Sequence, residues 1–349
     1  MSLLTPTQVR ETAEHIAAQQ QPDGLIPWFS GHYGDPWNHV EAAMALNAAG
    51  LRTQARAAYA WSAANQRPDG SWPMQTVGTT VTEASTDANQ VAYLATGLWH
   101  DWLLTGDRTY IREMWPTVRA AIEHVVGLQR ADGAIAWSRD PQGVASTKAL
   151  LIGSASIVLS LRSALALSEV VGDEQLDWEL ALARLAHAVA VHPDRFDELA
   201  EQGRYSMHWY YPVLGGAVGG PAARAWLASR WDDFVHPGLG VRCVADRPWV
   251  TAAETCELAL AFDAIGDRER AARLFSDIQF LRAPGGGYWT GWVWPEDVVW
   301  PGEQSTWTGG AVLLAADALG QRTPAHGLFR GVGLPEMLPA SCRDQCLVA

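Results

Sequence analysis

Positively charged clusters are missing from this 349-residue sequence, in which 25 Lys and Arg stand against 38 Asp and Glu. A surface that follows the phosphates of nucleic acid needs the opposite charge balance, so we expect no nucleic-acid partner. Charged residues are also sparse, at 18%, while 48% of the residues are hydrophobic. This composition is typical of a well-packed globular protein and not of a disordered one.

Cysteines and membrane-type segments are equally scarce. The four cysteines are too few for a disulfide scaffold, since Cys243 and Cys256 have no His at zinc spacing and Cys342 and Cys346 lie in a polar tail. We therefore expect no metal and no cofactor. The most apolar run, residues 149–167, contains Arg162, which favours a buried helix over a membrane span. The first residues show no basic stretch before an apolar core, so the predicted location is cytoplasmic.

An alternating strand pattern is also absent, whereas helical periodicity recurs along the chain. The spacing predicts twelve helices, over residues 6–21, 36–49, 52–66, 84–104, 107–130, 146–171, 173–192, 207–219, 221–231, 249–265, 267–283 and 303–320. The connections after the even-numbered helices are tight, as in "LLTGDRT", where Gly ends one helix and Asp starts the next. Those after the odd-numbered helices are long. This alternation predicts an all-α fold, an (α/α)6 toroid of six helical hairpins with the even-numbered helices inside.

Several of the long connections repeat one pattern of a polar residue, a turn with Gly and then Trp. Examples are "QQQPDGLIPW", "NQRPDGSWP", "LQRADGAIAW" and "FLRAPGGGYW". Self-similarity of this kind indicates an array of hairpins within one unit, and we interpret Asp23, Asp69 and Asp132 as turn formers. We predict one catalytic domain over residues 1–320, followed by an irregular tail over residues 321–349 on the outside of the ring.

Tryptophan is the residue in excess, with 18 Trp against eight Tyr and seven Phe. Half of them fall in or beside the long connections, which we expect to surround the mouth of the ring: Trp28, Trp37, Trp137, Trp209, Trp249, Trp292, Trp294, Trp300 and Trp307. Flat amphipathic rings suit ligands with apolar faces and polar edges, such as sugars.

Carboxylates accompany these tryptophans, and glycoside hydrolysis needs two of them, one acid and one base or nucleophile. Asp35 precedes Pro36 at a helix start, where the cap should keep it ionised and suited to be the base. Glu254 lies one turn into an inner helix among apolar residues, an environment that suits an acid. Asp35 is equally an ordinary cap, and Glu254 could instead pair with Arg242 or Arg247.

A further set of residues is expected to line the same mouth and to bind sugar hydroxyls or faces. They are Trp37, His39, Glu41, Asp87, Asn89, His208, Trp209, Trp249, Glu257, Trp294 and Glu303. Structural alternatives apply here too, because a lone His is often a hydrogen-bonded core residue and Asp87 or Glu303 could simply cap a helix.

Long motifs along the whole chain, including "DPWNHVEAAMAL", "DANQVAYLATGLWH" and "STWTGGAVLLAADAL", support a family assignment. The chain resembles an actinobacterial family often labelled prenyltransferase-like, with mycobacterial endomannosidases of methylmannose polysaccharide as functional relatives. The resemblance implies an α/α toroid and hydrolysis of internal α-1,4-mannosidic bonds with inversion. It also implies Asp35 in "GDPWNHVE" and Glu254 in "TAAETCEL" as the catalytic pair.

Three alternatives stay open at this level. The segment "WPEDVVWPGEQSTW" is similar to the last inner helix of glucoamylase-type enzymes, which would nominate Glu296 or Glu303. A prenyltransferase or terpene cyclase would act on an isoprenoid, although the sequence has no DxDD motif. A noncatalytic sugar-binding toroid would keep the Trp-rich mouth. We expect a metal-independent glycoside hydrolase with an oligosaccharide or polysaccharide partner, possessing no membrane span.

Overall fold

Helices dominate the computed structural model, which describes residues 3–196 and 202–337. Within these ranges the helices are α1 (Pro6–Ala17), α2 (Pro36–Ala48), α3 (Arg52–Ala64), α4 (Ala88–Thr105), α5 (Arg108–Val126), α6 (Leu151–Val171), α7 (Leu176–Val191), α8 (Ser206–Leu214), α9 (Gly220–Ala228), α10 (Trp231–Phe234), α11 (Ala252–Ala264), α12 (Arg268–Asp277) and α13 (Thr306–Gly320). Each of the twelve predicted helices is present, and the four-residue α10 is the addition.

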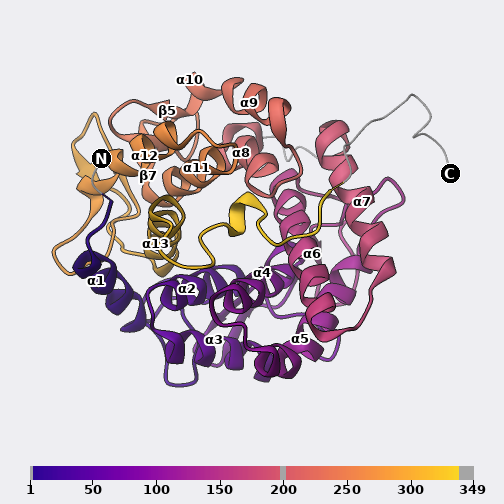
Figure 1. Cartoon of the computed structure of the whole chain (residues 1–349). Helices are drawn as coiled ribbons and strands as arrows, with labels where there is room; N and C mark the ends of the chain where they lie inside the picture. Colours follow the sequence, from indigo (N-terminus) through magenta and orange to yellow (C-terminus); the bar gives the residue numbers. More distant parts are fainter. Residues whose placement is uncertain (1–2, 197–201, 338–349) are drawn as a thin grey trace.

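Six helices follow one another around a closed cycle (Figure 1). In order they are α2, α4, α6, α8, α11 and α13, and α13 packs against α2. A second helix covers each from outside: α3, α5, α7, α9 and α12 pack on the helix before them, and α1 packs on α13. In α2 eleven of 13 residues are buried, against five of 13 in α3. The inner helices carry apolar residues on all sides, and such helices are stable only when other elements enclose them. This explains why more residues of α2 than of α3 are buried.

Short strands are the feature that the all-α prediction missed. They are β1 (Gln75–Val77), β2 (Thr80–Glu83), β3 (Thr86–Asp87), β4 (Ser138–Arg139), β5 (Val235–His236), β6 (Gly240–Arg242), β7 (Trp249–Thr251), β8 (Gly291–Val293) and β9 (Val298–Val299). The last five form an antiparallel sheet in chain order, while β1–β2 and β3–β4 are two-stranded. Strands of two to four residues are too short to show an alternating pattern. The predicted helix starts at residues 84 and 249 are therefore wrong, because β3 lies between residue 84 and the start of α4, and β7 begins at residue 249.

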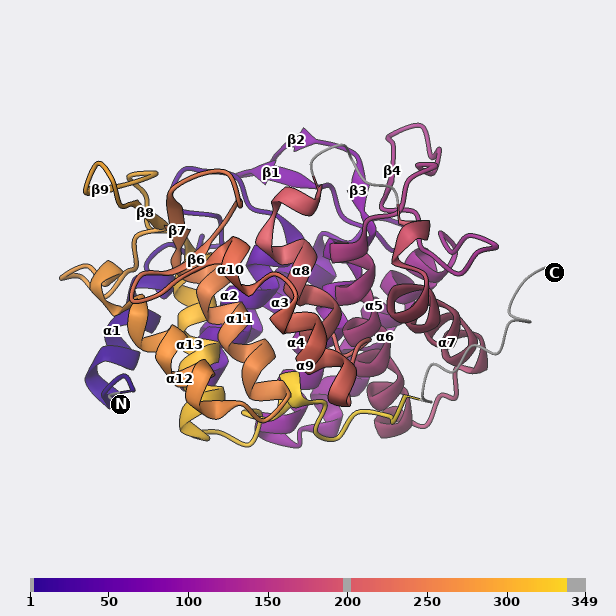
Figure 2. The ribbon, with the colours of Figure 1, turned by 90° about the horizontal axis from the view of Figure 1, so that it is seen from above.

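The strands and long connections gather on one side of the ring, and Figure 2 shows them along one edge of the molecule. β3 leads directly into α4 and β7 directly into α11, so the inner helices begin on this side. We call it the mouth. The opposite side carries the tight turns, such as Gly106–Asp107 between α4 and α5, where Gly106 adopts a φ of 60°.

The repeated Gly turns attach the long connections to the outer helices. The side-chain amide of Gln66 donates to Gly70 O and to Thr117 O of α5, and Gln20 and Gln129 make the equivalent pairs of bonds. A Cβ on Gly70 would lie 2.1 Å from Ala120 O, so this close approach requires glycine. Asp23, Asp69 and Asp132 each accept a backbone N–H two residues on, which confirms them as turn formers.

The segment after α13 corrects another prediction. Its described part, residues 321–337, does not lie on the outside of the ring but crosses the ring on the tight-turn side, as Figures 1 and 2 show in yellow. Arg330 forms a 3.5 Å ion pair with the buried Asp263 of α11, and the guanidinium of Arg162 in α6 donates to Pro335 O. Residues 338–349, with Cys342 and Cys346, are outside the described ranges.

The apolar run that contains Arg162 forms α6. It is long and apolar enough to cross a membrane, but 83% of its most apolar window is buried inside the protein.

Candidate active site

Two buried carboxyl groups line the same small space inside the ring, Glu41 from α2 and Glu257 from α11, each 3% exposed. The hydroxyl of Tyr93 donates to Glu41 over 3.1 Å, and that of Tyr211 donates to Glu257 over 2.7 Å, with Tyr210 on its other oxygen. Burial raises the pKa of both carboxyl groups. The charge of Asp35 raises the pKa of Glu41 further, and the charge of Glu41 raises that of Glu257. At neutral pH the pair therefore holds less than its full negative charge.

Asp35 caps α2 at the mouth, as predicted, and accepts the backbone N–H of Asn38 over 2.9 Å. The hydrogen bonds of the cap do not dominate the titration of this carboxyl group, because its pKa is raised and not lowered. Asp35 is only 5% exposed, and burial raises its pKa to about 6 despite the hydrogen bonds from Asn38. The negative charge of Asp87 contributes to the same shift. Asp87 caps α4 in the same way, and burial raises its pKa to about 6 as well.

Glu254 lies in the first turn of α11 and is 5% exposed. Among the described residues its Oε2 has no hydrogen-bond partner. Burial and the neighbouring Glu254 charge raise the pKa of the Cys243 thiol, which places this thiol beside the carboxyl group. The predicted alternative of a pair with Arg242 is not seen, since Arg242 donates to Ala245 O and lies over the Trp294 ring.

Glu303 belongs to the same neighbourhood on the α13 side. Its Oε1 accepts the indole N–H of Trp28 over 2.9 Å, and Trp28 packs against Trp307 with ring centroids 5.6 Å apart. The charges of Asp35 and Glu303, after burial, raise the pKa of Tyr33. Tyr33 therefore lies near both acids, a position that no periodicity in the sequence had indicated.

The other predicted sugar-binding residues occupy the helix starts and the sheet at the mouth. Trp37 stacks on Tyr93 at 3.7 Å between centroids, and Asn89 presents a buried Oδ1 that lacks a partner among the described residues. His208 lies in the first turn of α8 and is half-buried. Trp249 is the first residue of β7 and Trp294 directly follows β8, whereas the alternative acid Glu296 is exposed between β8 and β9.

His39 and Trp209 are corrections to the predicted site, because both serve the packing of helices. His39 is fully buried, accepts the Ile26 N–H at Nδ1 over 3.0 Å and contacts Ala58 O through Nε2 at 2.8 Å. Trp209 is 2% exposed, and its ring stacks on Phe234 at 5.6 Å. The polar atoms of both side chains are hydrogen-bonded within the protein, so they are not available to a sugar.

Tyr210 and Tyr211 are the residues that the sequence reasoning missed next to Trp209. In "HWYY" four polar rings follow one another, so composition could not tell which of them face the ring axis. A helix turns by about 100° per residue, and the rotation of α8 directs the two tyrosines to Glu257.

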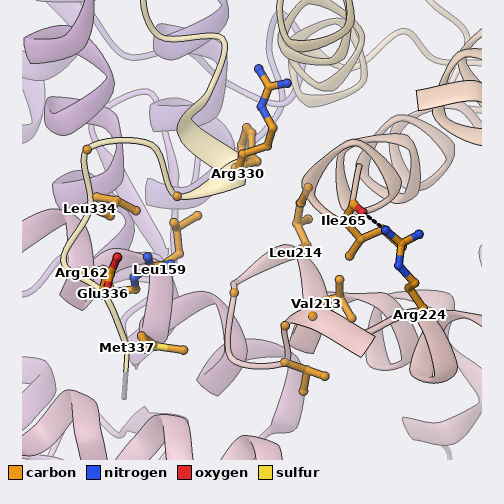
Figure 3. Close-up of a pocket in the computed structure, with 18 of the residues that line it drawn as sticks. Leu159, Arg162, Val213, Leu214, Arg224, Ile265, Arg330, Leu334, Glu336 and Met337 are labelled. Carbon is orange, nitrogen blue, oxygen red and sulfur yellow. Dashed lines mark hydrogen bonds between the residues drawn. The ribbon is translucent and has the colours of Figure 1, made fainter. Parts of the chain in front are cut away.

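A cavity of about 900 Å³ lies away from these residues, on the tight-turn side (Figure 3). Its walls include Leu159, Leu214, Arg162 and Arg330, and it contains none of the predicted site residues. A space of only about 10 Å³ lies between Glu41, Glu257 and Phe329, so Phe329 separates the ring axis from this side.

The comparisons with known proteins agree with this architecture. No protein-family model matches the chain. An MMP endo-(1,4)-3-O-methyl-alpha-D-mannosidase from Mycolicibacterium hassiacum is 54% identical over 344 residues, which covers 99% of this chain and 95% of that protein.

Solved structures share the fold at low identity. A wild-type glycosidase has a TM-score of 0.69 at 14% identity, with 90% of this chain and 98% of that chain covered. A D-mannose isomerase has a TM-score of 0.68 at 10% identity, with 91% and 98% covered. The fold alone thus fits more than one activity, whereas the 54% identity along 99% of the sequence is specific. The chain therefore belongs to the family of the MMP endo-(1,4)-3-O-methyl-alpha-D-mannosidase and is a glycoside hydrolase.

Proposed function

We propose that this enzyme hydrolyses internal α-1,4-mannosidic bonds of a 3-O-methylated mannose polysaccharide, with inversion at the anomeric carbon. The observation that carries the proposal is the 54% identity to the endomannosidase over 99% of the chain. The same proposal includes the fold and the wider family. We propose that the fold is an (α/α)6 toroid with residues 1–320 as one catalytic domain, and that the chain is like the actinobacterial family labelled prenyltransferase-like. The closed cycle of inner helices supports the toroid.

In the proposed reaction Glu254 is the general acid and Asp35 the general base. Glu254 gives its proton to the glycosidic oxygen as the bond from that oxygen to C1 breaks, and its unpartnered Oε2 is available for this contact. Water attacks C1 from the opposite face and loses a proton to Asp35. A carboxyl with a pKa of about 6 is mostly ionised at neutral pH and still accepts a proton readily.

The remaining polar and aromatic groups bind the sugar chain in this proposal. Trp37 and Trp249 supply flat faces, and hydroxyl partners come from the polar residues of the site: Glu41, Asp87, Asn89, His208, Glu257, Trp294 and Glu303. Glu303 is the second candidate for the base, since its carboxylate shares the neighbourhood of Tyr33 with Asp35.

The test uses α-1,4-mannosides of defined length, 3-O-methylated and plain, with chromatography of the products. We expect internal cleavage, and a β-anomer as the first product in proton NMR, because inversion of an α-linkage yields it. Glu254→Gln and Asp35→Asn should each lower kcat by about 10³-fold or more, with an unchanged melting temperature.

Wild-type rates in Asp35→Asn would remove Asp35 as the base, and Glu303→Gln is then the decisive variant. If the wild-type protein binds the mannosides but cleaves none of them, the proposed endomannosidase activity is wrong.

A further inference from the structure

One face of the sheet at the mouth carries a continuous row of apolar side chains. Residues directly opposite each other on antiparallel strands share a face. Trp249 of β7 is opposite Val293 of β8, which is opposite Val298 of β9. Trp300 lies two residues beyond Val298, so it projects to the same face. We call Trp249, Val293, Val298 and Trp300 the tryptophan shelf.

The shelf is built firmly. The Trp249 indole N–H donates to Trp300 O over 2.7 Å, and the two rings meet edge to face with centroids 4.8 Å apart. A Cβ on Gly291 would lie 2.3 Å from Trp249 Nε1, so the indole lies directly over this glycine. Glycine is required at that position because any side chain would push the indole away.

The outer end of the shelf is open to solvent. Trp300 is 53% exposed and Val298 is 45% exposed. Burial of such side chains by a ligand with apolar groups is favourable, since it removes apolar surface from water.

The inner end of the shelf reaches the proposed acid. Cys243 N donates to Trp249 O over 3.2 Å and continues the β6–β7 pairing, which places the Cys243 side chain on the same face. That thiol lies beside Glu254. β9 lies three strand spacings from Cys243, with β7 and β8 between them. This distance is about 14 Å at the usual separation of strands. A sugar chain cleaved at Glu254 can therefore extend over the shelf.

We infer that the tryptophan shelf is an outlying subsite for an O-methylated hexose, and that it favours methylated over plain segments of the chain. The inference rests on the proposed function. A methyl ether packs on valine and indole without a penalty, whereas a free hydroxyl there gives up hydrogen bonds to water. Burial of one methyl group favours binding by about fourfold, the equilibrium equivalent of one buried CH₂ group.

The experiment compares Trp300→Ala and Val298→Thr with wild type on long mannosides, methylated and plain, and on short ones that end before the shelf. Thr matches Val in shape, and the carbonyl of residue 300 persists in Trp300→Ala, so both variants should fold. Leu180→Ala, an exposed apolar residue on the outer helix α7, is the matched control.

For long methylated substrates we expect KM to rise about tenfold in Trp300→Ala and a few-fold in Val298→Thr, with kcat within twofold. Plain long substrates should lose only about two- to threefold in Trp300→Ala, because the indole also packs on unmethylated sugar, and short substrates should be almost unaffected. Equal losses on methylated and plain chains, or no loss at all, would overturn the inference. If wild type cleaves nothing, calorimetric titration with the same sugars still tests whether the shelf prefers methylated chains, independently of hydrolysis.

Discussion

Burial governs the titration of single residues along the ring axis. For Glu41 it raises the pKa above that of the unfolded chain, so the folded protein binds this proton more tightly. The stabilisation is complete below the unfolded pKa and is lost as pH rises through the folded pKa. Glu41→Gln cannot ionise but can still accept the Tyr93 hydroxyl.

Glu41→Gln should therefore raise the melting temperature relative to wild type at pH 8.5, by about 2 °C or more, with a smaller difference at pH 5. Differential scanning calorimetry at both pH values measures this, and Glu179→Gln, an exposed glutamate on α7, is the control. A melting temperature that falls at pH 8.5 would contradict the buried, protonated state of the pair.

If Asp35 is the base, as proposed, its titration sets the acid limb of the pH profile. Because burial raises its pKa to about 6, the proposed base becomes protonated and inactive below that pH. The kcat/KM profile should fall with a midpoint near pH 6. A midpoint near 4 would mean that a more exposed carboxylate is the base.

Replacement of His39 can distinguish a role of this residue in packing from a role in sugar binding. Its replacement by Ala leaves the Ile26 N–H buried without a partner and opens a cavity at a fully buried position, which together cost about 3 kcal/mol of unfolding free energy. Urea unfolding measures this loss, and KM of the folded variant should stay at the wild-type value. A raised KM with normal stability would restore His39 to the sugar site.

At the scale of elements, the start of α2 combines a helix cap with a proposed catalytic group. Asn caps helices about as well as Asp, so Asp35→Asn should retain stability, while Asp35→Ala should lose about 1 kcal/mol. Both variants should be inactive. Thermal melts together with rates distinguish the two functions, and an Asp35→Asn variant as unstable as Asp35→Ala would show that the charge itself holds the helix start.

Elements with strong local signals were predictable from the sequence, and those held by long-range pairing were not. Pro36 after Asp35 and Gly106 before Asp107 fix helix ends through their own chemistry. β7 pairs with β8, which is far from it in the sequence and near to it only in space. The same limit applies to the site, since the partners of Glu257 depend on the rotation of α8.

At the scale of the whole molecule, a substitution of Phe329 tests whether residues 321–337, which cross the tight-turn side, stabilise the fold or take part in catalysis. Phe329 packs against the hydrophobic core and lines the small space beneath Glu41 and Glu257. Phe329→Ala should lower the unfolding free energy by about 2 kcal/mol, because the side chain is only partly buried, and kcat should stay within twofold. Calorimetry and initial rates check this. Lost activity at unchanged stability would mean that the segment contacts the substrate.

Because Phe329 closes the ring on the tight-turn side, it also limits the path that a polysaccharide chain can take through the protein. With room for about a single water molecule beneath the carboxyl pair, a sugar chain has no exit there and cannot be threaded through the ring. The substrate must bind across the mouth, and both product fragments must leave through the mouth as well. Under the proposed internal cleavage neither terminus of the polymer is needed for binding, so the earliest products should already span many lengths.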